Sequence, residues 1–194
     1  MSYDQLKTLG DENDDRLAFF DSVPKGLERY DFRLRHGESV KDVYPEDAKL
    51  YMERHNRGVR LCSFLGNTKG MILASGELRR VIEDHCPGIR IEYLPFTVID
   101  HRKRPYSSDY CIVNPLGSFD AADVKASELE TNAQGKVLRI ERLVLDGRKI
   151  AKAPQLFRLD LRPSIYVVGP ALGAELRAQK LTNLVLEELQ VTGE

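Results

Sequence analysis

Met71-Ile72-Leu73-Ala74-Ser75-Gly76-Glu77-Leu78 begins a pattern that returns late in the chain as Ile165-Tyr166-Val167-Val168-Gly169-Pro170-Ala171-Leu172. Each copy is an apolar run followed by an amphipathic stretch, a polar break and a second apolar stretch. Three pairs of positions share a constant offset of 94 residues: Ser75 and Gly169, Leu78 and Leu172, and Ile82 and Leu176. The repeat predicts two related strand–helix–strand units, residues 71–93 and 165–187.

The helix of the first unit has the clearest local signals. Ser75 is a favourable N-cap, and Pro87-Gly88 is a typical stop. Leu78, Val81 and Ile82 are spaced to lie on one face, which we expect to be buried.

Composition limits the class of protein. The chain has 194 residues, of which 42% are hydrophobic and 30% charged, as in ordinary globular domains. Lys and Arg number 29 against 30 Asp and Glu, so the net charge of −1 argues against broad, non-specific binding of nucleic acid. There is no apolar segment suited to a secretory signal or a membrane span. Three widely spaced cysteines suggest no disulfide framework and fit a reducing, cytoplasmic setting.

The rest of the chain is rich in strand signals. Alternation over residues 30–35 predicts a strand, whereas Pro45 and the apolar spacing after it predict a helix to about residue 55. Further strands are expected at the following places: 89–93 and 96–99 with a break at Pro95, 110–113, 137–145 with a hairpin turn at Asp146-Gly147, and 157–161 ended by Pro163. We therefore expect one α+β domain over residues 1–194, with a mixed or mainly antiparallel sheet and a few short helices. Residues 1–27 could be a peripheral N-terminal segment.

Four blocks of sequence, in order, resemble a bacterial family of polymorphic-toxin immunity proteins, formerly a domain of unknown function. The blocks cover about four fifths of the chain: Gly37–Ala48 with Met52, Phe64–Asn67 with Leu73–Ser75, Ile91–Pro95 with Tyr110–Leu116, and Phe157–Leu159 with the closing unit to Leu184. Asn183 stands where the family typically has glycine.

The resemblance implies a non-enzymatic protein that binds and neutralises a cognate toxin, protecting the producing cell from itself or its kin. Some relatives are thought to act against nuclease toxins. The resemblance supplies no catalytic residues, metal or cofactor. It implies a protein partner, with no direct contact to nucleic acid or a membrane, and leaves the oligomeric state open.

One candidate contact surface is the acidic run Asp11-Glu12-Asn13-Asp14-Asp15. A nuclease site that holds phosphate is cationic, so clustered carboxylates could complement it. The carboxylates of Asp11, Glu12, Asp14 and Asp15 are therefore the predicted partner-binding groups. The alternative is a solvated N-terminal face.

Two other classes of protein remain open at this point. A small hydrolase or nucleotide-processing enzyme could use His85, Cys86, Asp120 or Asp123, although adjacent helical residues such as His85 and Cys86 diverge by about 100°. A structural subunit would be an obligate homo-oligomer. The basic stretch 101–104 could contact phosphate or form a solvated hairpin tip, and residues 66–70 lack the spacing of a phosphate loop and predict a turn.

Overall fold

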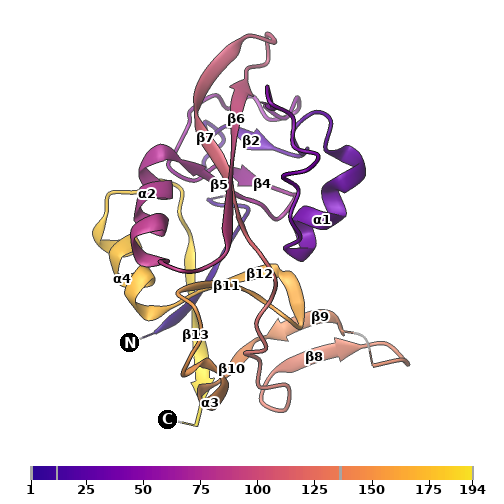
Figure 1. Cartoon of the computed structure of the whole chain (residues 1–194), viewed down its shortest axis with the longest axis vertical. Helices are drawn as coiled ribbons and strands as arrows, with labels where there is room; N and C mark the ends of the chain where they lie inside the picture. Colours follow the sequence, from indigo (N-terminus) through magenta and orange to yellow (C-terminus); the bar gives the residue numbers. More distant parts are fainter. Residues whose placement is uncertain (1, 12, 136, 194) are drawn as a thin grey trace.

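Two mixed β-sheets organise the computed structural model, which describes residues 2–11, 13–135 and 137–193 (Figure 1). The first sheet has the strand order β3 (Lys49–Tyr51), β6 (Ile91–Ile99), β7 (Pro105–Pro115) and β5 (Ile72–Ser75). The second has the order β10 (Val144–Asp146), β13 (Leu186–Thr192), β1 (Tyr3–Leu6), β12 (Arg162–Val168) and β11 (Leu156–Leu159). Two small ribbons accompany them: β2 (Phe19–Phe20) with β4 (Gly66–Asn67), and β8 (Glu128–Thr131) with β9 (Val137–Arg142).

The helices are short. The longest are α2 (Gly76–His85) and α4 (Pro170–Ala178), and the others are η1 (Glu28–Tyr30), α1 (Asp31–His36) and α3 (Gly147–Ile150). This arrangement confirms the predicted α+β class.

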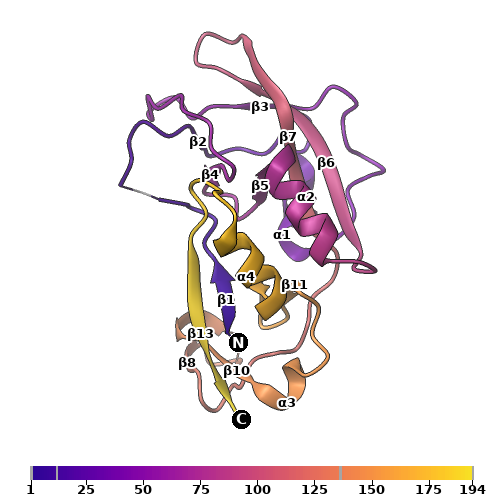
Figure 2. The same ribbon diagram turned by 90° about the vertical axis from the view of Figure 1, so that its left-hand side faces the viewer.

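The repeat predicted from sequence is present as two split β-α-β units. In the first unit, β5 and β6 both run antiparallel to β7, which lies between them. In the second unit, β12 and β13 both run antiparallel to β1, which again lies between them. The helices α2 and α4 follow the first strand of each unit and lie side by side (Figure 2).

Matching positions of the two helices have the same burial. Leu78 and Ile82 are 1% and 3% exposed, and their counterparts Leu172 and Leu176 are 0% and 5% exposed. The Ser75 hydroxyl caps α2 by accepting from the Leu78 N–H, as expected. Val81, also expected in the core, is only partly buried at its edge.

The sequence allowed the N-terminal segment to be peripheral, but in the structure it contributes a strand to the second sheet. β1 is the central strand of the second sheet, hydrogen-bonded on both sides to strands from the last third of the chain. Its pairing partners are far away in sequence, so no local pattern could indicate its place.

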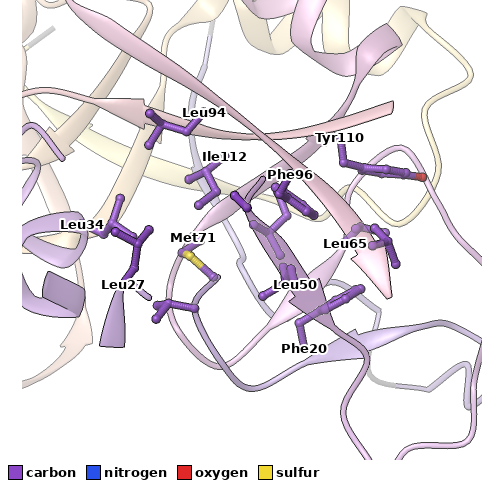
Figure 3. Packing of buried hydrophobic residues seen from close by; sticks show 14 of the residues in the cluster. Phe20, Leu27, Leu34, Leu50, Leu65, Met71, Leu94, Phe96, Tyr110 and Ile112 are labelled. Atoms are coloured by element: carbon purple, nitrogen blue, oxygen red, sulfur yellow. The ribbon is translucent and has the colours of Figure 1, made fainter. Parts of the chain in front are cut away.

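The first sheet is covered on both faces. α2 packs on one face. The chain between residues 18 and 52 covers the other face and ends by joining the edge of the sheet as β3. Phe20 and Leu27 of that covering segment pack against Leu50, Phe96 and Ile112 of the sheet (Figure 3). The fold of the N-terminal region is therefore fixed by the sheet that it covers.

Two predictions in this covering segment were wrong. Residues 31–36 form α1 rather than a strand, and Gly37, with φ +70°, closes the helix by donating to backbone carbonyls of its last turn. Residues 49–51 form β3 rather than a helix. Ala48, Leu50 and Met52 are buried at alternate positions, because pairing with β6 overrides the helical spacing.

Three further predictions, made from prolines and a turn signal in the sequence, were also wrong. β6 continues through Pro95, whose carbonyl accepts from the Tyr44 hydroxyl at 2.8 Å, away from the β7 ladder. Asp146-Gly147 does not form a hairpin, because the Asp146 side chain caps α3. Pro163 lies within β12, after a turn that ends β11 at Leu159.

A buried arginine joins the two sheets. Arg158 of β11 is 2% exposed, and its guanidinium donates to the carbonyl oxygens of Leu34, Pro115 and Pro163 and to Asn114 Oδ1, at 2.8–2.9 Å. The acceptor on Leu34 belongs to the negative end of α1, which suits a cation.

The network continues from Asn114 into the first sheet. Asn114 Nδ2 donates to the buried Glu92 carboxylate at 3.1 Å. Ser39 and the Val40 N–H also donate to that carboxylate. The stem of Arg158 leaves no room for a side chain at Gly37, where a Cβ would lie 2.7 Å from Arg158 Cδ. Most of these residues lie in the blocks that carry the family resemblance, so those blocks share a structural role.

Candidate partner-binding surface

The acidic segment forms the rim of a surface hollow. The loop between β1 and β2 carries Asp11, Asp14 and Asp15 around a depression of about 270 Å³. Its lining also includes Leu9, which is 37% exposed, and apolar side chains that follow the loop: Leu17, Ala18 and Phe19. Glu12, the fourth predicted carboxylate, lies outside the described residues. The hollow therefore combines an acidic rim with an apolar floor.

The carboxylates of the rim are not equivalent. Asp14 is held by Arg16 through two contacts of 2.7 Å, with Arg60 at 3.9 Å. The hydrogen bond from Arg16 is the main reason that the pKa of Asp14 falls to about 2. Its charge is thus largely compensated within the protein.

Asp11 and Asp15 are the more available charges. Asp11 accepts from the backbone and side-chain N–H groups of Asn13, at 3.0 and 3.3 Å, and both Asp11 and Asp15 are exposed. Neither carboxylate has an ion pair among the described residues. A partner cation would meet these two groups without displacing an arginine.

Asn183 holds this loop in place. Its φ is +61°, a conformation that glycine adopts freely and asparagine tolerates. Its Oδ1 accepts from the Asp11 N–H at 2.6 Å, and its Nδ2 donates to the Phe64 carbonyl at 2.9 Å. A side chain at Gly10 would collide with Asn183, since a Cβ there would lie 2.6 Å from its amide. The sequence showed that Asn183 stands in place of the family's glycine, but it did not show that the Asn183 side chain contacts residues 10 and 11.

The residues of the enzyme alternative are engaged in structural contacts. Cys86 is 6% exposed, and burial raises its pKa to about 11, so little thiolate forms near neutral pH. His85 Nδ1 lies 2.9 Å from the Val81 carbonyl of its own helix rather than facing Cys86.

The two aspartates of that alternative are also occupied. Asp120 pairs with Lys149 at 2.8 Å. Asp123 accepts from the N–H groups of Lys125 and Ala126 and from the Thr192 hydroxyl, an arrangement that lowers its pKa and fastens β13. No group of three His, Cys, Asp or Glu side chains that could hold a metal ion occurs among the described residues.

The turn predicted at residues 66–70 is present at residues 68–69, directly after the short strand β4. The buried Asn67 amide donates to the carbonyls of Leu65 and Met71, and its Oδ1 accepts from the N–H groups of Lys69 and Met71. This asparagine organises the turn before β5 and leaves no cradle of free N–H groups at that position.

A second hollow, of about 500 Å³, lies on the face of the second sheet beside β9. Its charges are mostly compensated: Lys7 pairs with Glu187, and Arg142 binds Glu128 and Gln190. Its lining has three basic and three acidic side chains, so it lacks the acidic excess of the first hollow.

The geometry thus defines a protein with a candidate binding surface, in which the four residues of the enzyme alternative make structural contacts. The model of the immunity protein family Imm11 matches residues 6–191 of the chain. The chain belongs to this family, and its role is that of an immunity protein, which binds a toxin partner. No curated protein sequence matches the chain. Within the described part of the structure, every helix is too short or too polar to cross a membrane.

Proposed function

We propose that this protein neutralises its toxin by stoichiometric, non-enzymatic binding in the cytoplasm, and that the toxin is a nuclease. The observation that carries the proposal is the hollow with Asp11 and Asp15 on its rim and Leu17 and Phe19 on its floor. A lysine or arginine from a phosphate-binding cleft could place its aliphatic stem on that floor and its charge between the carboxylates. Glu12 would add a further negative charge to the same loop.

Stoichiometric inhibition is the decisive measurement. A toxic domain is first sought in the neighbouring reading frames by its toxicity to cells without this protein. It is then purified and assayed on DNA and RNA while this protein is titrated into the reaction. A nuclease activity that ends at equimolar protein supports the proposal. Multiple turnover, in which a small fraction of an equivalent inactivates the toxin, would support the enzyme alternative instead.

The acidic rim is tested with a charge-neutral variant. Asp11→Asn, Glu12→Gln, Asp14→Asn and Asp15→Asn together should slow association and flatten its salt dependence, because steering charges act mainly on the association rate. A matched control neutralises four carboxylates that are exposed and lie outside the loop: Glu46, Asp84, Glu130 and Glu188. Equal association rates for both variants and the wild type would refute a role for the rim.

A further inference from the structure

A basic surface is formed by two loops that are distant in sequence. Residues 53–60 follow β3, and residues 100–106 form the tip of the long β6–β7 hairpin, which projects at one end of the molecule (Figure 1). His101 Nε2 lies 3.3 Å from the Gly58 carbonyl oxygen and joins the loops. The exposed basic residues of this surface are Arg54, His55, Arg57, Arg60, His101, Arg102, Lys103 and Arg104.

The carboxylates within these loops are turned toward the backbone. Glu53 accepts from the N–H groups of His55 and Asn56 at 2.8 and 2.6 Å. Asp100 accepts from the N–H groups of Arg102 and Arg104, each at 2.8 Å, and also binds the Arg104 guanidinium. The acidic groups therefore shape the loops, while the basic side chains extend outward.

Four of the cations make no ion pair with any residue that the structure describes. Arg60 approaches Asp14 and Arg104 pairs with Asp100. The remaining long side chains have no ion pair within the described residues: Arg54, Arg57, Arg102 and Lys103. Cations gathered in this way repel one another in the free protein, which is a cost to stability that a partner could relieve.

Lys103 adds a backbone cost at the same place. Its φ is +59°, in the left-handed region where glycine or asparagine is favoured over a long side chain. A lysine in this conformation at an exposed hairpin tip strains the backbone locally, and backbone strain of this kind is common at functional sites.

We propose that this basic surface is a second part of the toxin-binding interface and that it engages an acidic patch on the toxin. The identity of the partner rests on the proposed function, whereas the chemistry of the patch rests on the loops themselves. Together with the acidic rim, the surface would recognise a partner that presents both signs of charge.

A protein partner fits this surface better than a nucleic acid. The first of the two basic loops, residues 53–60, is joined to the acidic segment. The main chain of Arg60 makes hydrogen bonds of 3.0 Å with that of residue 16 and that of residue 18. Asn56 of the basic loop also lines the acidic hollow. A phosphate backbone bound beside Asn56 would meet the acidic hollow, whose exposed carboxylates on Asp11 and Asp15 repel it. Val59 and Tyr106, 44% and 49% exposed, supply the apolar contacts typical of a protein interface.

The test compares two fourfold charge variants of the full chain. The first carries Arg54→Gln, Arg57→Gln, Arg102→Gln and Lys103→Gln. The control carries Arg90→Gln, Lys125→Gln, Lys152→Gln and Lys180→Gln, which are exposed residues outside both loops. Binding to the purified toxic domain from the neighbouring reading frame is measured by surface kinetics at low and high salt, with a short DNA duplex as a second probe.

The first variant should associate with the toxic domain about tenfold or more slowly at low salt, and the control should match the wild type. Wild-type binding with equal rates for both variants would overturn the basic surface while leaving the proposed function intact. Absence of wild-type binding would instead refute the proposed function and, with it, the toxin as occupant. Salt-dependent binding of DNA that only the first variant loses would assign the surface to nucleic acid and overturn the inference.

A single substitution tests the strain argument independently of the toxin. Lys103→Asn should raise the midpoint of thermal unfolding, because asparagine tolerates the left-handed backbone and removes one repelling charge. Lys125→Asn is the control, because Lys125 is exposed and its backbone is not left-handed. A Lys103→Asn midpoint equal to or below that of the wild type would overturn the reasoning that this lysine is retained at the expense of stability.

Discussion

Replacement of Arg158 by methionine should destabilise the fold by about 3–5 kcal/mol, the range found when a buried charge network is broken. The guanidinium makes four hydrogen bonds of 2.8–2.9 Å and lies 4.5 Å from the centroid of the Tyr166 ring. Methionine keeps most of the apolar stem but donates nothing.

The magnitude follows from what is left behind. Hydrogen bonds to charged groups contribute about 1.5–3 kcal/mol each, and the desolvation of the guanidinium, which also lowers the Arg158 pKa, offsets part of that gain. Three of the acceptors are backbone carbonyls that lose this donor in the variant: those of Leu34 and Pro115 are buried, and that of Pro163 is partly buried. An apolar side chain can often replace a buried ion without loss of stability. Here it cannot, because these carbonyl oxygens would lose their hydrogen-bond donor.

Urea unfolding followed by circular dichroism measures the loss, and the thermal midpoint should fall by roughly 6–20 °C for a chain of this size. Arg158→Lys should recover only part of the loss, because an ammonium cannot reproduce the planar fork. Arg90→Met, at an exposed position, should change stability by less than about 0.5 kcal/mol and serves as the control. An Arg158→Met protein within 1 kcal/mol of the wild type, taken as roughly the ordinary effect of a point mutation, would refute the argument.

Ile82→Ala should cost roughly 2–5 kcal/mol, since Ile82 is buried between the two units, and an unchanged urea midpoint would contradict this burial. Cys86→Ala and His85→Ala should keep full protection in cells that produce the toxin, and loss of protection by a well-expressed variant would revive the enzyme alternative. The carboxyl of Asp14 should titrate near pH 2 by NMR in the wild type and closer to its usual value in Arg16→Gln. Because its folded pKa is lowered, its stabilising contribution is complete above about pH 4 and is lost as the pH falls toward 2; a midpoint near 4 in the wild type would contradict the pairing.

Local signals predicted the elements whose partners lie nearby or whose caps are explicit. The α2 helix has its N-cap at Ser75, a clear stop and an apolar face, and it formed as expected. β7 contains the apolar run 110–113 and was also predicted, although its exposed part toward the hairpin tip was not. The internal repeat indicated the second unit because both copies bury equivalent positions.

The errors came from contacts that sequence order hides. Leu50 faces the core because β3 pairs with β6, a pairing that the local helical spacing could not indicate. Arg158 looked like an ordinary polar residue in an alternating strand, and its burial depends on acceptors from three other segments.

The candidate surface shows the same division. The acidic run could be recognised in the sequence. The hydrogen bond from Arg16 to Asp14 and the one from the Asp11 N–H to Asn183 could be found only in the structure. The sequence indicated residues 53–60 only as the expected end of a helix and not as part of a basic surface. Its meeting with the hairpin tip is a tertiary contact between residues 58 and 101.

The central place of β1 sets the order in which the molecule can be completed during synthesis. Tyr3–Leu6 is made long before its two neighbours, β12 and β13. In a nascent chain β1 therefore stays unpaired until β12 has been made, and it gains its second neighbour only when β13, which ends at Thr192, follows. Pairings between the two ends of a chain are slow to form and leave strand edges exposed meanwhile. Polypeptides that stop before β13 cannot complete this sheet, so we expect folded protein only after a delay set by translation and folding together.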